Sequence, residues 1–382
     1  MKNPKKFWIA VATLVGTIIG AGILGLPYVI AQAGFWTGVL DIILLGSIVL
    51  LLYLYLGEVV LRTKGLHQLP GYAEKYLGKL GKKLMVFAMF FGNYGALIAY
   101  IIGVGSATAA IFGGFSMFGL SPSLFYSLIF FIVVAFIILV GLKAVGNSEL
   151  LMLPLIIGIV LFIAAASFGK IDIINLTSFN IFKILIPYGV ILFAFLGASS
   201  IPVLREQLVN NEKQIKKAIF IGVLIPIISY LIFAVAVVGV TGSSTTEVAT
   251  IGLGESIGMY MILIGNFLAI ITMTTSFLTL GLALKESYNY DYKLNQNIAW
   301  ALTCFPPLII ALSGFTTFVK IIGLSGVIAG GLEGVLITLM ALKAKKKGSR
   351  KPEYKVPINW MVTAGLIAVF VFGAGYYLWS LV

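Results

Sequence analysis

Glycines and a proline interrupt the first apolar stretch of the chain, between Gly16 and Pro27 (GTIIGAGILGLP). Gly costs about 1 kcal/mol and Pro about 3 kcal/mol inside a helix, so we expect a helix to break here. The freed backbone groups of Gly20, Ala21 and Gly22 then need a polar partner, because unwound backbone at membrane depth is tolerated only beside a cavity or buried in protein. A half-helix N-terminus suits a carboxylate, and freed carbonyl oxygens suit a cation.

A second apolar stretch carries the same kind of interruption, in LFAFLGASSIPVLREQL. Its small or helix-breaking residues are Gly197, Ala198, Ser199, Ser200 and Pro202. If the first ten helices form two halves of five with opposite orientation, both breaks occupy corresponding positions, which is typical of secondary transporters. The alternative is that small residues only let helices pack closely. Two breaks at matching positions favour the binding site.

The composition indicates a membrane protein that crosses the bilayer many times. Of 382 residues, 60% are hydrophobic and 10% are charged, and the mean hydropathy is +1.09, far above a soluble domain. The net charge of +13 lies in short polar breaks rather than on one face, which argues against nucleic-acid binding. One Cys and one His, Cys304 and His67, exclude an intrachain disulfide and argue against a Cys/His metal site.

Windows of about 20 apolar residues predict eleven transmembrane helices. We expect them near 7–33, 36–61, 83–112, 122–142, 149–168, 181–207, 214–240, 256–284, 296–313, 318–342 and 357–380. The first is too long for the apolar region of a signal peptide, so we expect it to stay in the protein. The predicted fold is an all-α membrane domain over 1–382, with inverted repeats at 7–168 and 181–342 and an extra helix at 357–380.

The positive charges alternate between loops, which predicts the orientation in the cell membrane. Lys and Arg gather at 62–83, 213–217 and 343–355, whereas the loops 113–123 and 241–254 contain neither. The basic loops are therefore expected to be cytoplasmic, together with the N-terminus. An odd number of helices then leaves the C-terminal Val382 outside.

The interrupted segments carry a resemblance to known permeases. VGTIIGAGILGLP with Tyr28 and AQAGF, FAFLGASSIPVLRE, and YGALIAYIIGVGSA at 94–107 resemble the amino acid/auxin permease family of the amino acid–polyamine–organocation superfamily. TSFLTLGLAL at 275–284 is more similar to the neighbouring hydroxy and aromatic amino acid permeases. The resemblance implies a LeuT-like five-plus-five fold and amino acid uptake coupled to sodium or protons, and it leaves both branches open.

The resemblance also implies a substrate site between the two breaks. The amides of Ala21 and Gly22 would hold the carboxylate of an amino acid, and the carbonyls of Ile19 and of 193–195 would hold its ammonium group. Phe195 would gate the pocket unless it is only packing. Asn93 and Tyr94 would close the site from the third helix, or else form an ordinary polar contact between helices. The implied substrate residues are Ile19, Gly20, Ala21, Gly22, Ile23, Asn93, Tyr94, Phe193, Phe195, Gly197 and Ser199.

A cluster of hydroxyls in the eighth expected helix, Thr272 to Ser276, suggests an ion site. By the resemblance, sodium would bind oxygens of Gly16, Ile19, Thr272, Thr275 and Ser276, an all-oxygen set that a hard cation prefers. Ser and Thr in membrane helices also bond to their own i−4 carbonyls, which would explain each hydroxyl without an ion. The fifth expected helix holds no lysine in place of the ion, which favours sodium, and proton coupling stays open.

Three acidic residues fall within apolar segments, where charge is usually functional. Glu333 is the deepest, and we interpret it as a proton carrier or a gate, the alternative being an acid in a watery vestibule. Glu58 precedes Arg62 by four residues, so the two are expected to form an ion pair. Asp41 lies near the outer end of the second expected helix, where we expect water to reach it.

Other classes of function fit the sequence less well. No nucleophile with a base, HExxH helix or pair of membrane aspartates indicates an enzyme, and no cofactor is implied. We therefore expect a secondary active transporter that imports neutral or aromatic amino acids by ion-coupled symport. A channel or an ion-independent amino acid exchanger is the alternative. The expected partners are the amino acid, sodium or protons, and the lipid bilayer.

Overall fold

The fold is known from a computed structural model, which describes residues 4–113, 119–140, 149–290 and 292–379. Within these residues the chain forms helices and no strand. The α-helices are α1 (Pro4–Ile18), α2 (Gly22–Ala33), α3 (Phe35–Leu61), α4 (Leu69–Phe112), α5 (Pro122–Val140), α6 (Glu149–Ser167), α7 (Tyr188–Ala194), α8 (Ser200–Gln207), α9 (Ile215–Thr241), α10 (Ala249–Ile257), α11 (Met259–Tyr290), α12 (Gln296–Leu312), α13 (Phe318–Ser325), α14 (Gly331–Lys347) and α15 (Trp360–Trp379). A π-helical segment, η6 (Gly326–Gly330), joins α13 to α14.

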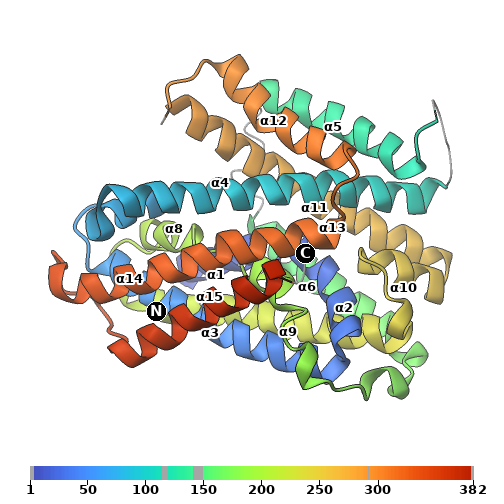
Figure 1. The fold of residues 1–382 in the computed structure, drawn as a ribbon, viewed down its shortest axis with the longest axis horizontal. Helices are drawn as coiled ribbons and strands as arrows, with labels where there is room; N and C mark the ends of the chain where they lie inside the picture. The colour runs from blue at the N-terminus through green and yellow to red at the C-terminus, as the bar shows by residue number, and fades with distance from the viewer. Residues whose placement is uncertain (1–3, 114–118, 141–148, 291, 380–382) are drawn as a thin grey trace.

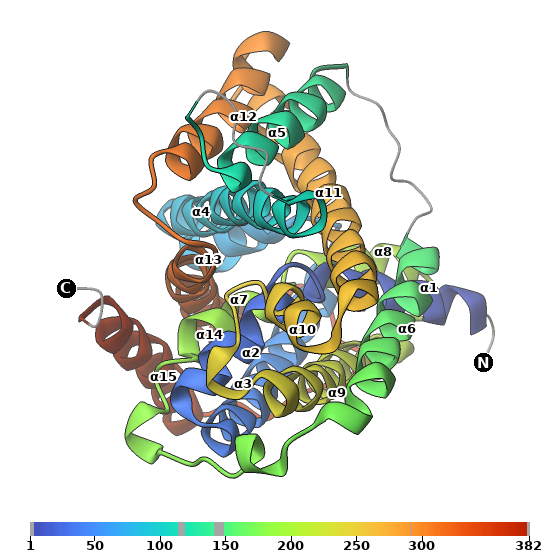
Figure 2. The ribbon, with the colours of Figure 1, turned by 90° about the vertical axis from the view of Figure 1, so that its right-hand side faces the viewer.

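The helices form two packed groups. Helices α4, α5, α11 and α12 pack on one another, and α1, α2, α3, α6, α7, α8 and α9 form the other group (Figures 1 and 2). Helices α13 and α14 connect the groups, since α13 contacts both α4 and α7 and α14 contacts both α3 and α4. The broken helices therefore belong to one group, and α4 and α11 face them from the other.

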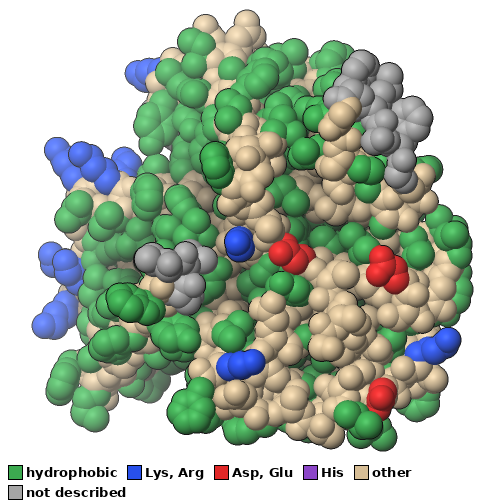
Figure 3. Space-filling view, turned by 45° about the vertical axis from the view of Figure 1, so that its right-hand side comes forward, with side chains coloured by type: hydrophobic (Ala, Val, Ile, Leu, Met, Phe, Trp, Pro, Cys, Tyr) green, Lys and Arg blue, Asp and Glu red, His purple; other side chains and the backbone are tan. Residues whose placement is uncertain are grey.

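Seven helices in the described residues are long and apolar enough to cross a membrane, and the bent pair α1–α2 makes an eighth span. Two shorter apolar helices lie at Pro154–Lys170 and Gln296–Leu312. On the face shown in Figure 3 hydrophobic side chains are widespread, and Lys and Arg side chains gather at the left edge, with a few elsewhere. A multi-pass all-α membrane protein is thus confirmed, whereas the total of eleven helices, the inverted repeat and the orientation remain predictions.

Several expected segments differ in detail from the helices observed. Helix α4 begins at Leu69, well before the expected start of its span, and Gly78 interrupts it with φ 81°. The expected span 318–342 is α13, η6 and α14 in sequence. Residues 114–118 of one expected outer loop, and Val382 at the C-terminus, lie outside the described residues.

Buried Glu58 organises the end of the molecule where α3 and α14 terminate. Its carboxylate accepts from Arg62 Nε (2.7 Å), confirming the expected ion pair. It also accepts from Lys345 Nζ (2.6 Å) and from the backbone amide of Val356 (2.7 Å), which the sequence did not indicate. Burial, and next the Glu58 carboxylate, raise the pKa of Tyr354, so its hydroxyl stays protonated and donates to the carbonyl of Leu54. The segment between α14 and α15 is thereby fixed to α3.

The expectation for Asp41 was wrong. Asp41 is only 3% exposed, and its Oδ2 atom is buried without a hydrogen-bond partner among the described residues. Its position near a helix end suggested access to water. Helix α3 packs against α9 and α2, and this packing buries the carboxyl.

Candidate substrate and ion site

The first helix break lies where the sequence predicts it. Helix α1 ends at Ile18 and α2 begins at Gly22, and the two are bent by 53°. Within the described residues, no acceptor forms a hydrogen bond with the backbone amides of Ala21, Gly22 or Ile23. These buried amides point from the positive end of the α2 dipole, which is an environment that stabilises an anion.

The second break separates α7, which ends at Ala194, from α8, which begins at Ser200. The two breaks touch each other. A Cβ placed on Gly22 would lie 2.6 Å from the Cα of Ala194, and one placed on Gly197 would lie 2.6 Å from Ile18 Cγ1. Such approaches leave no room for a side chain, so glycine is required at both positions for the breaks to meet.

Tyrosine hydroxyls satisfy the carbonyl oxygens that the breaks set free. The Tyr230 hydroxyl of α9 donates to the carbonyl of Ala194 (2.6 Å) and lies 3.1 Å from that of Ile18. The Tyr53 hydroxyl of α3 donates to the carbonyl of Phe195 (2.6 Å). One side chain therefore bridges the two breaks, and another fixes the second break to α3.

A third tyrosine approaches the breaks from the opposite group of helices. Tyr100 of α4 is 4% exposed, and its hydroxyl lies 3.5 Å from the point where a Cβ of Gly20 would be. The hydroxyl of Tyr100 also lies near the side chain of Ser276 on α11. Tyr100 thus links the first break to the cluster of hydroxyls on α11.

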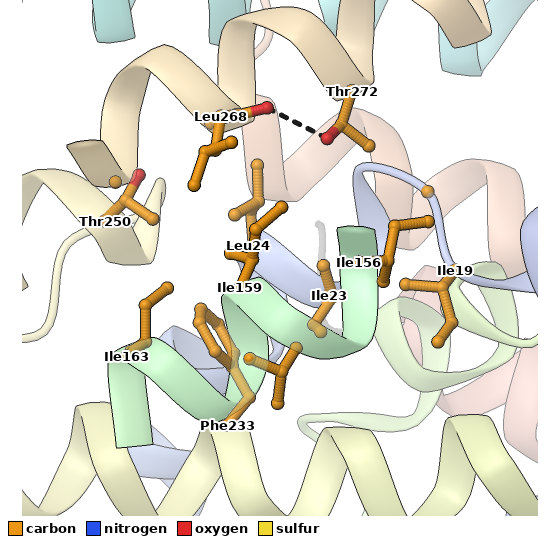
Figure 4. Close-up of a pocket in the computed structure, with 14 residues that line it drawn as sticks. Ile19, Ile23, Leu24, Ile156, Ile159, Ile163, Phe233, Thr250, Leu268 and Thr272 are labelled. Atoms are coloured by element: carbon orange, nitrogen blue, oxygen red, sulfur yellow. Dashed lines mark hydrogen bonds between the residues drawn. The ribbon is translucent and has the colours of Figure 1, made fainter. Parts of the chain in front are cut away.

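A cavity opens beside the first break, with an empty volume of about 460 Å³ including its open part (Figure 4). Apolar side chains of α6, α9 and α11 form most of its wall, as do Ile23 and Leu24 of α2. Of its two hydroxyls, Thr272 donates to the carbonyl of Leu268 (2.9 Å) and Thr250 to the Asn266 side chain (2.8 Å). The cavity therefore presents an apolar lining whose hydroxyls donate within the protein. Residues of the second break do not line it.

Some of the expected substrate residues lie at the breaks or the cavity, and Tyr94 does not. Ile19, Gly20 and Ile23 line the cavity, and Ser199 is exposed within the second break. Tyr94 does not face the breaks, because its hydroxyl bonds to Tyr288 (2.7 Å) and to the carbonyl of Leu302 (2.7 Å). Its neighbour Asn93 is half-buried on the same helix.

Phenylalanines of the second break are packed into the protein. Phe195 is 1% exposed, and its ring meets that of Tyr230 edge to face at 5.2 Å between centroids. The backbone amide of Phe193 faces Gly326 of η6 so closely that a Cβ there would lie 2.5 Å from it. The contact with Tyr230 shows the Phe195 ring packed in this structure, and its role as a gate stays a prediction.

The hydroxyls expected to bind an ion mostly bond within their own helix. Thr275 donates to the carbonyls of Ile271 (3.1 Å) and Thr272 (3.0 Å), which is the alternative that the sequence left open. Gly16 lies on α1, and a Cβ on it would meet no heavy atom within 4 Å. Helix α11 packs mainly against α4 and α10. Sodium binding by α1 and α11 together therefore stays a prediction. In the residues that the structure describes, no cluster of His, Cys, Asp and Glu could hold a metal ion.

Glu333 stands in the first turn of α14, directly after the π-helical segment. Its side chain is half-buried, and its carboxylate is within electrostatic range of the Tyr53 hydroxyl. The Tyr53 hydroxyl in turn donates to the carbonyl of Phe195 in the second break. The place of Glu333 in the fold is compatible with a proton-carrying or gating role.

Sequence reasoning missed the three tyrosines, Tyr53, Tyr100 and Tyr230. A signal was present, because a tyrosine in an apolar helix needs a partner for its hydroxyl when it is buried. The partner itself could not be named, since it lies in a segment distant in the sequence in every case.

Comparisons with known proteins agree with the fold. Residues 3–380 match the tryptophan/tyrosine permease family. The tyrosine-specific transport system 1 of Haemophilus influenzae is 27% identical, over 94% of this chain and 92% of that protein. Glutamine transporter 2 of Aliivibrio fischeri is 24% identical over 90% of each. The structure of MhsT in complex with L-phenylalanine has a TM-score of 0.66 at 14% identity, over 96% of this chain and 98% of that one.

These matches bear directly on the resemblance found in the sequence. They confirm an amino acid permease with a LeuT-like fold, and the prediction that the chain is not an enzyme is confirmed because the family and its relatives are transport proteins. The matching family is not the amino acid/auxin branch.

Proposed function

Since this chain belongs to the tryptophan/tyrosine permease family, we propose that it imports an aromatic amino acid by ion-coupled symport, with the substrate bound at the first helix break. The observation that carries the proposal is the set of unpaired amides at Ala21, Gly22 and Ile23 within the described residues, beside an apolar cavity. Relatives named as tyrosine- and tryptophan-specific transporters support the substrate class.

The amide groups would bind the carboxylate of the amino acid. The positive end of α2 stabilises the negative charge, so no arginine is needed. Among the described residues no donor is found for the carbonyl of Ile19, which would accept from the ammonium group, whereas the carbonyls of Ala194 and Phe195 already accept from tyrosines. Tyr100, next to Gly20, closes the site from the opposite group of helices.

The aromatic side chain would occupy the apolar cavity. Both hydroxyls in its wall donate to other parts of the protein, so a carboxamide placed there would lack donors. An unpaired polar group in such a site costs about 1–3 kcal/mol, which lowers affinity about 5- to 150-fold. We therefore expect the ring of phenylalanine or tryptophan to bind better than the side chain of glutamine.

The coupling ion would be sodium, bound by carbonyls near Gly16 and Ile19 and by Thr275 and Ser276 when α11 approaches the first break. This contact requires the two groups of helices to move, which is what alternating access provides. Glu333 supports the second candidate, a proton, because it is a carboxylate within electrostatic range of the Tyr53 hydroxyl.

Uptake by proteoliposomes tests the proposal. Labelled phenylalanine, tryptophan, tyrosine, leucine and glutamine would be supplied with a sodium gradient or a pH gradient imposed separately. Accumulation of an aromatic amino acid above its equilibrium level, driven by one gradient, is the expected result. Equal uptake with no gradient would indicate an ion-independent exchanger or a channel, and preferential glutamine uptake would contradict the substrate class.

A further inference from the structure

A second cavity lies at the basic end of the molecule, between α3 and α9. Its lining consists of Leu54, Lys213, Lys216, Lys217 and Phe220, and its empty volume is about 600 Å³ including its open part. All three lysines are exposed, and Phe220 is 48% exposed. We call this cavity the lysine groove.

The charges of the lysine groove have little compensation from the protein. No ion pair found among the described residues includes these lysines. Lys217 lies over the Phe7 ring, 6.0 Å from its centroid. The nearest acid in sequence, Glu212, lies 4.0 Å from Arg350, which leaves the groove with three positive charges and no carboxylate in its lining.

A bilayer centred on α9 would place the groove at the depth of lipid headgroups. Helix α9 has 27 residues, which is about 40 Å at 1.5 Å per residue. The hydrocarbon core is about 30 Å thick, so each end of α9 extends about 5 Å into the headgroup layer. Lys216 and Lys217 are in its first turn, and Phe220 lies about 5 Å deeper. In that position the ammonium groups would face phosphates, and the apolar lining would face the start of the acyl chains.

We propose that the lysine groove binds the headgroup of an anionic phospholipid. Its lysines attract the phosphate, and Leu54 and Phe220 contact the glycerol and the upper acyl chain. A basic pocket between transmembrane helices suits such a headgroup. A soluble anion would gain nothing from the apolar lining, which is why a lipid is the better occupant. This inference is independent of the substrate and of the coupling ion.

Titration with fluorescent phosphatidylglycerol, using the purified full-length protein in phosphatidylcholine nanodiscs, tests the proposal. The variant Lys213→Gln/Lys216→Gln/Lys217→Gln should raise Kd at least about tenfold, since each lysine near an anionic lipid contributes about fivefold. The matched control Lys343→Gln/Lys346→Gln/Lys347→Gln removes the same charge from exposed lysines at the same end of the molecule, and should change Kd less than about twofold.

Equal weakening in both triple variants would overturn the proposal, because the lipid would then respond to overall charge. Competition by soluble glycerol phosphate as effective as that by phosphatidylglycerol would overturn the choice of a lipid. If the groove variant does not purify as a single species, Lys216→Gln and Phe220→Ala decide the question separately. Each should raise Kd about threefold to fivefold, and unchanged values for both would contradict the site.

Discussion

Replacing Tyr230 by phenylalanine removes the one hydroxyl that joins the two helix breaks. The ring would stay, since it packs against Phe195 at 5.2 Å. The carbonyl of Ile18 keeps a partner, the amide of Gly20 at 3.0 Å, but the carbonyl of Ala194 loses the donor at 2.6 Å. Tyr230 is fully buried, so water does not replace that donor.

The expected loss follows from one buried acceptor without a partner, which costs about 1–3 kcal/mol. We expect Tyr230→Phe to lower the stability of the purified protein by that amount, measured by denaturant unfolding. In proteoliposomes we expect KM for the transported amino acid to rise about tenfold, which corresponds to 1.4 kcal/mol. The second effect arises because the breaks no longer hold the amides of Ala21 and Gly22 in one geometry.

Tyr55→Phe is the matched control. Its hydroxyl donates to the carbonyl of Pro357 at 2.8 Å, in the segment between α14 and α15 rather than at the breaks. This variant should lose stability but keep its KM. If Tyr230→Phe had the stability and KM of the unmodified protein, or if the control raised KM equally, the bridging hydroxyl would not organise the site.

Other variants separate packing from binding and one coupling ion from the other. Gly22→Ala should destabilise the protein by about 1–3 kcal/mol in denaturant unfolding, because its Cβ meets the backbone of α7. Gly20→Ala, whose Cβ meets only a hydroxyl at 3.5 Å, should fold normally and raise KM. Equal stability of the two variants would contradict the contact between Gly22 and α7. Thr275→Ala should raise the half-saturating sodium concentration if sodium drives uptake, and Glu333→Gln should abolish pH-driven accumulation but spare exchange if protons do. Arg205→Gln should lower the unfolding free energy by about 1.5–3 kcal/mol, because the buried guanidinium donates to one backbone carbonyl in the last turn of α3 and to two after it. An unchanged transition midpoint would refute this.

The sequence predicts the helix breaks well because their causes are local. Gly16 to Pro27 and Gly197 to Pro202 contain residues whose cost in a helix does not depend on distant contacts. The i,i+4 pair of Glu58 and Arg62 was predictable for the same reason. Its further partner Lys345 was not, because a separation of 287 residues leaves no periodic signal in the sequence.

The sequence does not indicate which face of α4 meets the helix breaks, so it could not identify the tyrosine that lies at the site. Tyr94 and Tyr100 lie on the same helix, six residues apart, and only one of them was expected at the site. Six residues turn a helix by about 600°, which leaves the two side chains about 120° apart around its axis, on different faces. Without knowledge of which face of α4 meets the breaks, the choice between them could not be made, and Tyr94 instead contacts Tyr288.

Close packing and a binding site, which the sequence offered as alternatives for the small residues at the breaks, are compatible with each other. Gly22 and Gly197 permit close packing, because a Cβ on either would lie 2.6 Å from the opposite break. The same packing leaves the amides of Ala21 to Ile23 without acceptors within the described residues, at the positive end of a helix. A site that binds a carboxylate through backbone groups alone needs its backbone held rigidly by something other than the ligand. Contact between the two breaks supplies that rigidity, so close packing is a condition of the proposed binding site and not a rival explanation for the glycines.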